Sequence, residues 1–368
     1  MRKRELKNME WWVLIIALIL CAIGLVALFS ATQNSNYDSF YKQLLWLGIS
    51  LGIMVIFAVI DYEKIVKASP IFYVVFLVLL VAVLFTKPIN GASSWFDIGF
   101  FSFQPSEFAK IFLILFLAYV ISKIQAKQKE DINKISRLLL ILIIIGIPIL
   151  LIVKEPDYGT ATAFIIATLM MLFTAGIDKK YIIVTVLLVA IAVPVLYNFV
   201  LPDHAKQRID VFLNPESDPR GAGYNILQSK LAIGAGEFTG MGVLKGNQTQ
   251  LGFLYPKTTD FIFSVISEEM GFVVSTSIII LYVVLITKAL YIAKTAKDTK
   301  GSVIATGIAG IFLFHMLENI GMVMGLLPIT GVPLLFISYG GSSLITSFIC
   351  VGLLLNISGK RQKTIFVK

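Results

Sequence analysis

The composition of the chain changes at residues 208–271, which read RIDVFLNPESDPRGAGYNILQSKLAIGAGEFTGMGVLKGNQTQLGFLYPKTTDFIFSVISEEMG. This stretch combines acidic, basic and amide side chains with a cluster of glycines, whereas the chain on either side consists mostly of long apolar runs. Near its end it leads into an apolar helix that opens with Thr258, Thr259, Asp260 and Phe261. A membrane protein with one long polar loop is expected to place its chemistry or its partner contacts there. We expect chemistry, with Asp260 at its centre.

The composition identifies the broad class. Hydrophobic residues make up 57% of the chain and charged residues only 14%, whereas about 25% of a water-soluble domain is charged. Many apolar runs reach roughly 18 residues or more, which is long enough to cross a ~30 Å hydrocarbon core. The runs do not alternate between apolar and polar residues as the strands of a membrane barrel do. The sequence therefore predicts an all-α, polytopic membrane protein.

We predict about ten transmembrane helices within a single membrane domain, residues 1–368. One large loop, residues 201–259, separates the seventh and eighth. The predicted spans are residues 11–31, 43–61, 69–86, 105–123, 137–153, 159–176, 181–200, 260–290, 302–327 and 332–357.

The distribution of positive charge predicts the orientation. If the N-terminus is cytoplasmic, most of the 31 Lys and Arg residues lie in the cytoplasmic segments, as the positive-inside rule requires. Both termini are then cytoplasmic and residues 201–259 are extracytoplasmic. The net charge of +9 is explained in this way without nucleic-acid binding. The basic N-terminus and the apolar run after it resemble a signal peptide, but we interpret them as an uncleaved first span.

With this topology, four polar stretches meet on the outer side of the membrane. They are residues 91–110, residues 154–160, the long loop and residues 319–343. Polar groups at membrane depth are costly, so they usually face a protein interior or an aqueous cavity. Gly and Pro in such stretches are typical of broken helices that line a cavity.

Several other classes of site have no support. The chain has no phosphate loop of the Walker kind and no Gly-x-Ser-x-Gly elbow. His204 and His315 are far apart in sequence, and Cys21 and Cys350 lie inside apolar runs. Neither a zinc motif nor a disulfide framework is indicated.

Each candidate residue also has a purely structural explanation. Asp260 could cap the eighth span, or it could act as a general base whose pKa is raised by partial burial. Glu107 and Lys110 are three residues apart on one helix face, so they could form an ordinary pair at a helix start or present an ammonium to a diphosphate. Glu268, Glu269 and Glu318 lie inside predicted spans and are expected to face the protein interior.

The remaining charged candidates lie in connections. Lys154, Glu155 and Asp157 could form a solvated turn or the charged rim of the same cavity. Arg208 and Arg220 could be solvated, or they could pair with phosphate through the planar guanidinium fork.

Taken together, the motifs resemble the SEDS family (shape, elongation, division and sporulation). The matching blocks extend in order through nearly the whole chain: Gln104-Pro105-Ser106-Glu107 with Lys110; residues 154–160; residues 212–219 with Gly223-Tyr224 and Gln228-Ser229; Ala232-Ile233-Gly234; residues 259–263 with Glu268-Glu269; and residues 338–343. The compact length and Gln248-Thr249-Gln250 look more like the elongation branch, RodA, than the division branch, FtsW. The family's catalytic aspartate corresponds to Asp260.

The resemblance implies a ten-span glycosyltransferase of the bacterial inner membrane that polymerises lipid II into peptidoglycan during cell-wall elongation. It also implies a class B penicillin-binding protein as partner, and it implies no organic cofactor and no nucleic acid. Matching positions suggest substrate contacts at Lys110, Glu107, Lys154, Glu155, Asp157, Gln228, Thr259 and Ser338. We add Arg208 and Gln250 from the long loop as further substrate contacts.

Two departures from the family pattern concern the site. Ser94 stands before Trp95 where the family usually has a basic residue. Lys257-Thr258-Thr259-Asp260 lacks the acid that usually precedes the catalytic aspartate, so any role of that acid cannot be transferred to this chain.

The mechanistic hypothesis is an inverting single displacement with Asp260 as general base and undecaprenyl diphosphate as leaving group. Lys110, Arg208 and Lys154 would offset the diphosphate charge, alone or with a divalent cation such as Mg²⁺ or Mn²⁺. Glu107, Glu155 and Asp157 could orient these bases or bind the cation. Two alternatives remain open: a flippase for lipid-linked precursors, and a non-catalytic scaffold that activates a penicillin-binding protein.

Overall fold

The architecture is helical, as predicted. The computed structural model describes residues 3–87, 93–97, 99, 102–181, 183–185, 187, 197, 203–219 and 221–361. The helices are α1 Lys3–Asn8, α2 Trp12–Ala31, α3 Asp38–Val59, α4 Tyr62–Val83, α5 Pro105–Ile124, α6 Ile135–Lys154, α7 Tyr158–Ala175, α9 Asp203–Leu213, α10 Ala222–Ala235, α11 Asn247–Gln250, α12 Ile262–Thr295, α13 Thr299–Val323 and α14 Gly341–Gly359. Short 3-10 turns cover Gln33–Ser35, Lys129–Asn133 and Pro215–Ser217, and strands β1 (Phe96–Asp97) and β2 (Ser102–Phe103) pair antiparallel.

The predicted spans correspond well to these helices. In the described part of the chain, eight helices are long and apolar enough to cross a membrane: α2, α3, α4, α6, α7, α12, α13 and α14. α5 matches the predicted fourth span and has 20 residues, but it carries Glu107, Lys110 and Lys123. The predicted seventh span, 181–200, lies largely outside the described residues. The total of ten spans therefore stays a prediction.

The predicted last span, 332–357, begins too early. The helix α14 starts at Gly341, and residues 324–340 form a non-helical segment between α13 and α14. Pro328 and Pro333 have no backbone N–H to donate, and Gly325 and Gly331 adopt φ of 69° and 75°. Because of these residues α13 ends at Val323 and α14 begins only at Gly341. We call residues 324–340 the re-entrant segment.

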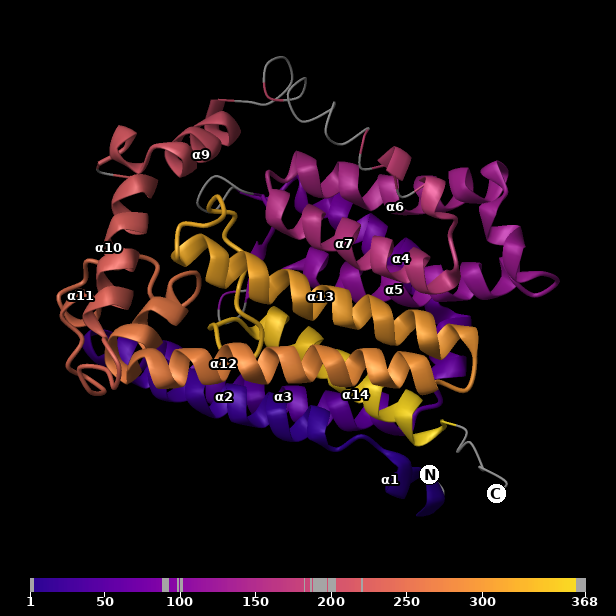
Figure 1. The fold of residues 1–368 in the computed structure, drawn as a ribbon, viewed down its shortest axis with the longest axis horizontal. Helices are drawn as coiled ribbons and strands as arrows, with labels where there is room; N and C mark the ends of the chain where they lie inside the picture. The colour runs from indigo at the N-terminus through magenta and orange to yellow at the C-terminus, as the bar shows by residue number, and fades with distance from the viewer. Residues whose placement is uncertain are drawn as a thin grey trace.

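α13 and α14 form the centre of the bundle. In their apolar stretches 89% and 94% of the residues are buried, against 22% in α3, α4 and α6. α13 packs between α12 and α7, and α14 packs against α3 (Figure 1). Glycines permit these close approaches: a Cβ on Gly310 would lie 2.9 Å from the Ala167 Cα, and one on Gly352 would lie 2.5 Å from the Met54 carbonyl oxygen. Close packing at small residues is the usual way in which helices associate in membranes.

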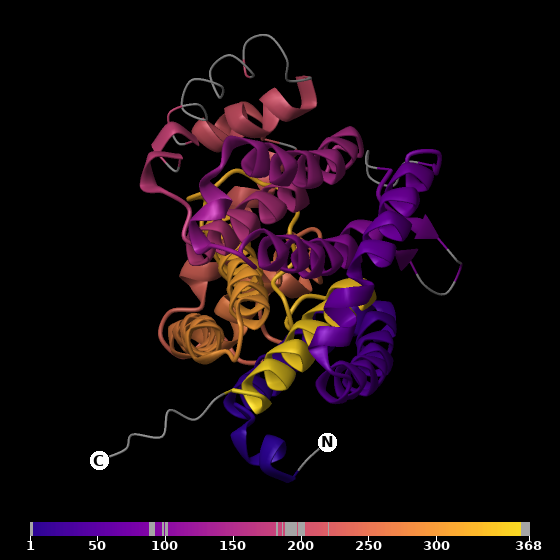
Figure 2. The same cartoon turned by 90° about the vertical axis from the view of Figure 1, so that its right-hand side faces the viewer.

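The first described helix, α1, and the C-terminal end of α14 lie at the same end of the bundle (Figures 1 and 2). Ion pairs join the elements there: the Lys288 ammonium lies 2.8 Å from the Glu10 carboxylate, and the Arg361 guanidinium lies 3.3 Å from it. Helices α9, α10 and α11 lie at the other end, on the left of Figure 1. The ends of the bundle are therefore chemically distinct.

The long polar stretch binds to a break in α12 rather than forming a free loop. At Gly271 the backbone has φ 75° and ψ −172°, a conformation that is essentially restricted to glycine. The carbonyl oxygens of Glu268 and Glu269 accept 2.9 Å hydrogen bonds from the backbone N–H groups of Met241 and Gly242. Beyond the break, two more backbone N–H groups of α12 donate to carbonyls of the same loop. Non-helical backbone at this depth is tolerated only because such partners satisfy it.

Candidate active site

Asp260 lies in the turn that precedes α12, outside the helix itself. The Asn319 amide on α13 donates a 3.0 Å hydrogen bond to the Asp260 carbonyl oxygen. The Ser338 hydroxyl donates a 2.8 Å hydrogen bond to the Thr259 carbonyl oxygen. Two elements far away in sequence therefore hold the backbone on either side of the Asp260 peptide.

The environment of the Asp260 carboxyl suits a general base. Partial burial raises its pKa to about 6, against the effects of a hydrogen bond from Thr259 and of the positive charge of Arg208. Its Oδ2 faces the backbone of Gly331 in the re-entrant segment, at 3.5 Å from the position that a Cβ would take there. A carboxyl with a pKa near neutrality can both accept and release a proton at working pH.

A second polar cluster is buried between α5, α13 and α14. Lys110 and Glu107 form an ion pair with a 2.7 Å N–O distance, and both side chains are almost completely buried at 3% and 2% exposure. The Thr346 hydroxyl donates to the second oxygen of Glu107 at 3.2 Å. The Lys110 ammonium also lies 3.0 Å from Nε2 of His315, which is itself buried. This cluster is a satisfied internal network.

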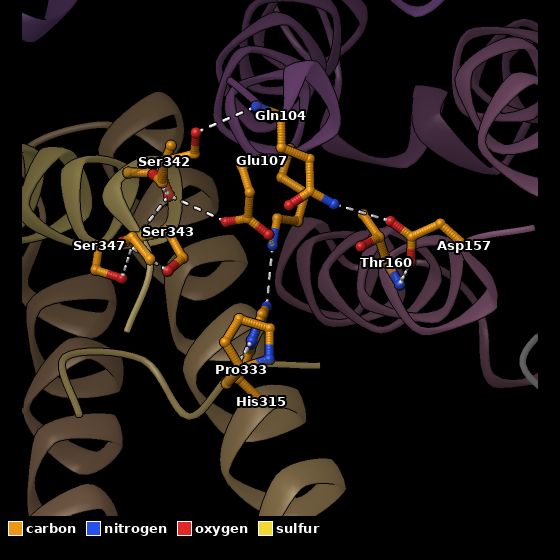
Figure 3. Close-up of polar contacts among 12 residues, drawn as sticks. Gln104, Glu107, Asp157, Thr160, His315, Pro333, Ser342, Ser343 and Ser347 are labelled. Atoms are coloured by element: carbon orange, nitrogen blue, oxygen red, sulfur yellow. Dashed lines mark hydrogen bonds and ion pairs between the residues drawn. The ribbon is translucent and has the colours of Figure 1, made fainter. Parts of the chain in front are cut away.

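A third group lies beside this network and is visible in Figure 3. The Gln104 side-chain amide donates a 3.1 Å hydrogen bond to Asp157 Oδ2, and the Gln104 backbone N–H donates to the Ser342 hydroxyl at 3.2 Å. Asp157 caps α7 by accepting a 3.0 Å hydrogen bond from the Thr160 N–H. The starts of α5, α7 and α14 therefore meet at one place.

Glu155 is the unusual member of this region. It is fully buried, and within the described residues neither of its carboxylate oxygens has a hydrogen-bond partner. Burial, followed by the negative charge of Asp157, raises the Glu155 pKa to about 8. The Ser94 hydroxyl donates to the backbone carbonyl oxygen of Glu155 at 3.3 Å and not to the carboxylate. Burial also raises the pKa of Asp157. Among the described residues, no three His, Cys, Asp or Glu side chains gather in a group that could hold a metal ion.

Other predicted residues have structural roles. Glu268 accepts hydrogen bonds from the Gln248 N–H and from the Thr249 hydroxyl, both at 2.6 Å. Gln250 donates to Glu269 at 3.0 Å and to the Ser30 hydroxyl at 2.9 Å. These bonds hold α11 against α12 and α2, so the side-chain amide of Gln250 stabilises the packing of these helices.

The remaining candidates are more scattered. Lys154 is exposed at the end of α6, Gln228 is half-buried on α10, and Arg208 is half-buried on α9. Of these three, only Arg208 is close enough to Asp260 to affect its pKa. Arg220 lies outside the described residues.

Sequence reasoning missed two residues of α13. His315 and Asn319 are four residues apart, so they share one helix face, and both contact the centres described above. The signal was available, because buried polar side chains inside an apolar span are rare and usually serve a purpose. Metal-ligand spacing, the other test for a histidine, does not reveal this contact of His315.

The chain is similar over nearly its whole length to proteins of known name. A family model described as cell cycle protein (FtsW, RodA, SpoVE) matches residues 10–363. The peptidoglycan glycosyltransferase MrdB of Escherichia coli (strain K12) is 39% identical over 350 residues, which cover 95% of this chain and 93% of that protein. The peptidoglycan glycosyltransferase RodA of Treponema pallidum (strain Nichols) is 32% identical, covering 98% of this chain and 100% of that protein.

Solved structures share the fold. A chain of a peptidoglycan synthase complex, studied for its coordination of polymerization and crosslinking, gives a TM-score of 0.82 at 26% identity, covering 95% of this chain and 97% of that chain. The rod shape determining protein RodA of Thermus thermophilus gives 0.72 at 25% identity, covering 96% and 98%.

Proposed function

The chain belongs to the cell cycle protein family of FtsW, RodA and SpoVE, and from this premise we propose how it works as a peptidoglycan glycosyltransferase. The observation that carries the proposal is the environment of the Asp260 carboxyl. This carboxyl is partly buried with a pKa of about 6, and the positive charge of Arg208 acts on it. A base and a cation at one site are the minimum for transfer of a sugar from a diphosphate carrier.

In this proposal the substrate is lipid II. Asp260 removes the proton from the 4-hydroxyl of the acceptor sugar, and the oxygen forms a bond to C1 of the donor sugar. The bond from C1 to the diphosphate oxygen breaks at the same time, so undecaprenyl diphosphate leaves with the electron pair. One displacement inverts the configuration at C1, so no covalent sugar–enzyme intermediate is needed. Arg208 offsets the charge that develops on the diphosphate.

Lys110 contributes differently from the sequence hypothesis. Its ammonium is buried and already pairs with the Glu107 carboxylate, so we assign it to support of the site. Thr259 and Ser338 likewise support the turn around Asp260 through the hydrogen bond between them.

We also propose that Glu155 and Asp157 hold the divalent cation that the family resemblance implies. The fit rests on the two unpartnered, buried oxygens of Glu155 and on Asp157 close by. Mg²⁺ is commonly held by one or two carboxylates together with waters and substrate phosphates, so a pair of carboxylates is sufficient. When bound, the ion would supply positive charge for the diphosphate.

Binding of Mn²⁺ to the purified protein tests this site without an activity assay. Electron paramagnetic resonance should detect bound Mn²⁺ in the wild type, with affinity lowered at least about tenfold in Glu155→Gln and in Asp157→Asn. Glu318→Gln is the control, because that buried carboxylate accepts a hydrogen bond from Thr330 instead. Equal Mn²⁺ affinity in the wild type and the three variants would refute a cation site at Glu155 and Asp157.

The proposal also includes a partner protein and a location in the cell. The structural similarity to a chain of a peptidoglycan synthase complex supports a class B penicillin-binding protein as partner. We propose that the bacterial inner membrane holds the protein with both termini in the cytoplasm, so that α9, α10 and α11 face the outer side. The similarity to RodA proteins supports a role in cell-wall elongation.

The pH dependence of polymerisation tests the base directly. The base acts when deprotonated, so activity should rise with pH through about 6. At pH 5 only about a tenth of the molecules would carry the Asp260 carboxylate. The measurement is the initial rate of glycan formation from labelled lipid II, with the partner protein present, between pH 5 and 8. A rate that does not change between pH 5 and 7.5 contradicts the assignment.

The same assay separates the alternatives. Glycan made by this chain excludes a purely scaffolding role. If no glycan forms under any condition while labelled precursor crosses the bilayer of a vesicle, the chain is a flippase instead.

A further inference from the structure

His315 is a buried side chain that the proposed chemistry does not use. Its Nδ1 lies 2.9 Å from the Pro333 carbonyl oxygen, and its Nε2 lies 3.0 Å from the Lys110 ammonium. A carbonyl only accepts hydrogen bonds, so Nδ1 must carry the proton. The Nε2 of a neutral imidazole then has the free lone pair and accepts from Lys110.

The imidazole does not serve to balance charge. The Glu107 carboxylate already pairs with the Lys110 ammonium at 2.7 Å, and a neutral imidazole adds no charge to this pair. What the ring adds is a bridge, because it joins an ion pair anchored in α5 to a carbonyl of the re-entrant segment. In Figure 3 His315 overlaps Pro333 in the view, and a dashed line joins it to the ammonium beside Glu107.

The next turn of α13 makes a parallel contact. The Asn319 amide donates to the Val332 carbonyl oxygen at 2.9 Å and to the Asp260 carbonyl oxygen at 3.0 Å. His315 and Asn319 therefore hold the consecutive carbonyls of Pro333 and Val332 to one helix face. Gly331, the residue before them, faces the Asp260 carboxyl. The bridge ends next to the proposed base.

We propose that His315 is a positioning residue for Asp260. It ties the re-entrant segment to the buried Glu107–Lys110 pair, and the tied segment forms the wall that keeps the Asp260 carboxyl partly dehydrated. This inference rests on the proposed function of Asp260 as base.

Two substitutions of His315 test the proposal in the lipid II assay. His315→Leu removes both hydrogen bonds, and His315→Gln retains an amide acceptor and donor. We expect kcat to fall about 10- to 100-fold in His315→Leu with KM changed less than about threefold, because a small displacement of a base costs rate more than binding. On the acid side of its pH profile, kcat/KM rises with an apparent pKa, and we call this part of the profile the acid limb. In His315→Leu this apparent pKa should fall below about 6, because a displaced re-entrant segment admits water to the Asp260 carboxyl. His315→Gln should recover most of both quantities.

The control is Ile308→Ala, which creates a cavity at a fully buried position of the same helix without touching either hydrogen bond of His315. It should lower thermal stability and leave the acid limb at about 6. The proposal is overturned if His315→Leu keeps the wild-type acid limb, if its loss lies in KM alone, or if His315→Gln loses as much rate as His315→Leu. Asp260→Asn in the same assay distinguishes the two failures, because a variant that stays active refutes the base and not the contacts of His315.

Discussion

Asp260→Asn should lower the rate of glycan polymerisation by about 10²- to 10⁴-fold, the range that a general base contributes. The substitution keeps the size of the side chain and the backbone hydrogen bond from Asn319, but the amide cannot take up a proton. The acceptor hydroxyl then has no base, whereas the turn that carries the residue is unchanged. The measurement is the initial rate of glycan formation from lipid II, with the partner protein present.

A stability measurement on the same variant excludes misfolding as the cause. Burial raises the pKa of Asp260 to about 6, so folding favours the protonated form of this carboxyl. Its favourable contribution is present below the unfolded pKa and is lost as the pH rises through 6. Asp260→Asn should therefore be more thermally stable than the wild type at pH 7.5 and no more stable at pH 4. A site that is costly for stability and needed for activity is expected of a catalytic group.

Asp38→Asn is the matched control, because it removes the exposed carboxylate that pairs with Lys42 and should change neither quantity. Full polymerase activity of Asp260→Asn would refute the base. An equal loss of polymerase activity in Asp260→Asn and Asp38→Asn would show that the loss comes from the assay or from misfolding and not from the missing base.

The sequence predicted the helical architecture well because bilayer physics allows few solutions. An apolar run such as residues 12–31 must be helical to satisfy its backbone. The position of Asp260 before a helix was also readable from Thr259, Asp260 and the apolar residues after them. The structural alternative for Asp260 was wrong, because α12 begins at Ile262 with Phe261 as its N-cap and without a side-chain cap. The comparisons confirm the family that these motifs indicated.

The contacts of the site were harder to predict. Asn319 and Ser338 reach the turn around Asp260 from positions about 60 and 80 residues further along the chain, and no local pattern specifies such pairings. Gln250 looked like a substrate contact because it matched a motif, yet its amide binds Glu269. A polar residue that supports an irregular backbone and one that touches substrate look alike in sequence.

The early start predicted for the last span has a related cause. Residues 332–340 are largely apolar, so hydropathy extended the helix over them. Proline and positive-φ glycine in the re-entrant segment override that tendency. The segment lies against Asp260 and His315, so the least regular part of the chain is also the part nearest to the proposed chemistry.

Lys110→Met should destabilise the protein by about 3–5 kcal/mol, because it leaves the Glu107 carboxylate buried without its cation. Glu107→Gln should cost a similar amount by leaving the buried ammonium without a counter-charge. The double variant should recover most of the loss, since two neutral side chains of similar size replace the pair. Thermal unfolding of the purified protein, followed for both single variants and the double variant, measures this coupling.

Lys42→Met provides the comparison at an exposed pair. Lys42 and Asp38 also lie within one helical turn at 2.7 Å, but their side chains are 44% and 64% exposed, so its loss should cost less than about 1 kcal/mol. The difference in stability loss between Lys110→Met and Lys42→Met shows which role Lys110 has. If its removal is as harmless as that of Lys42, water reaches the ion pair and the ammonium is free to meet a diphosphate. If the single variants unfold easily and the double variant does not, the pair is an internal support, and Arg208 remains the cation that faces the leaving group.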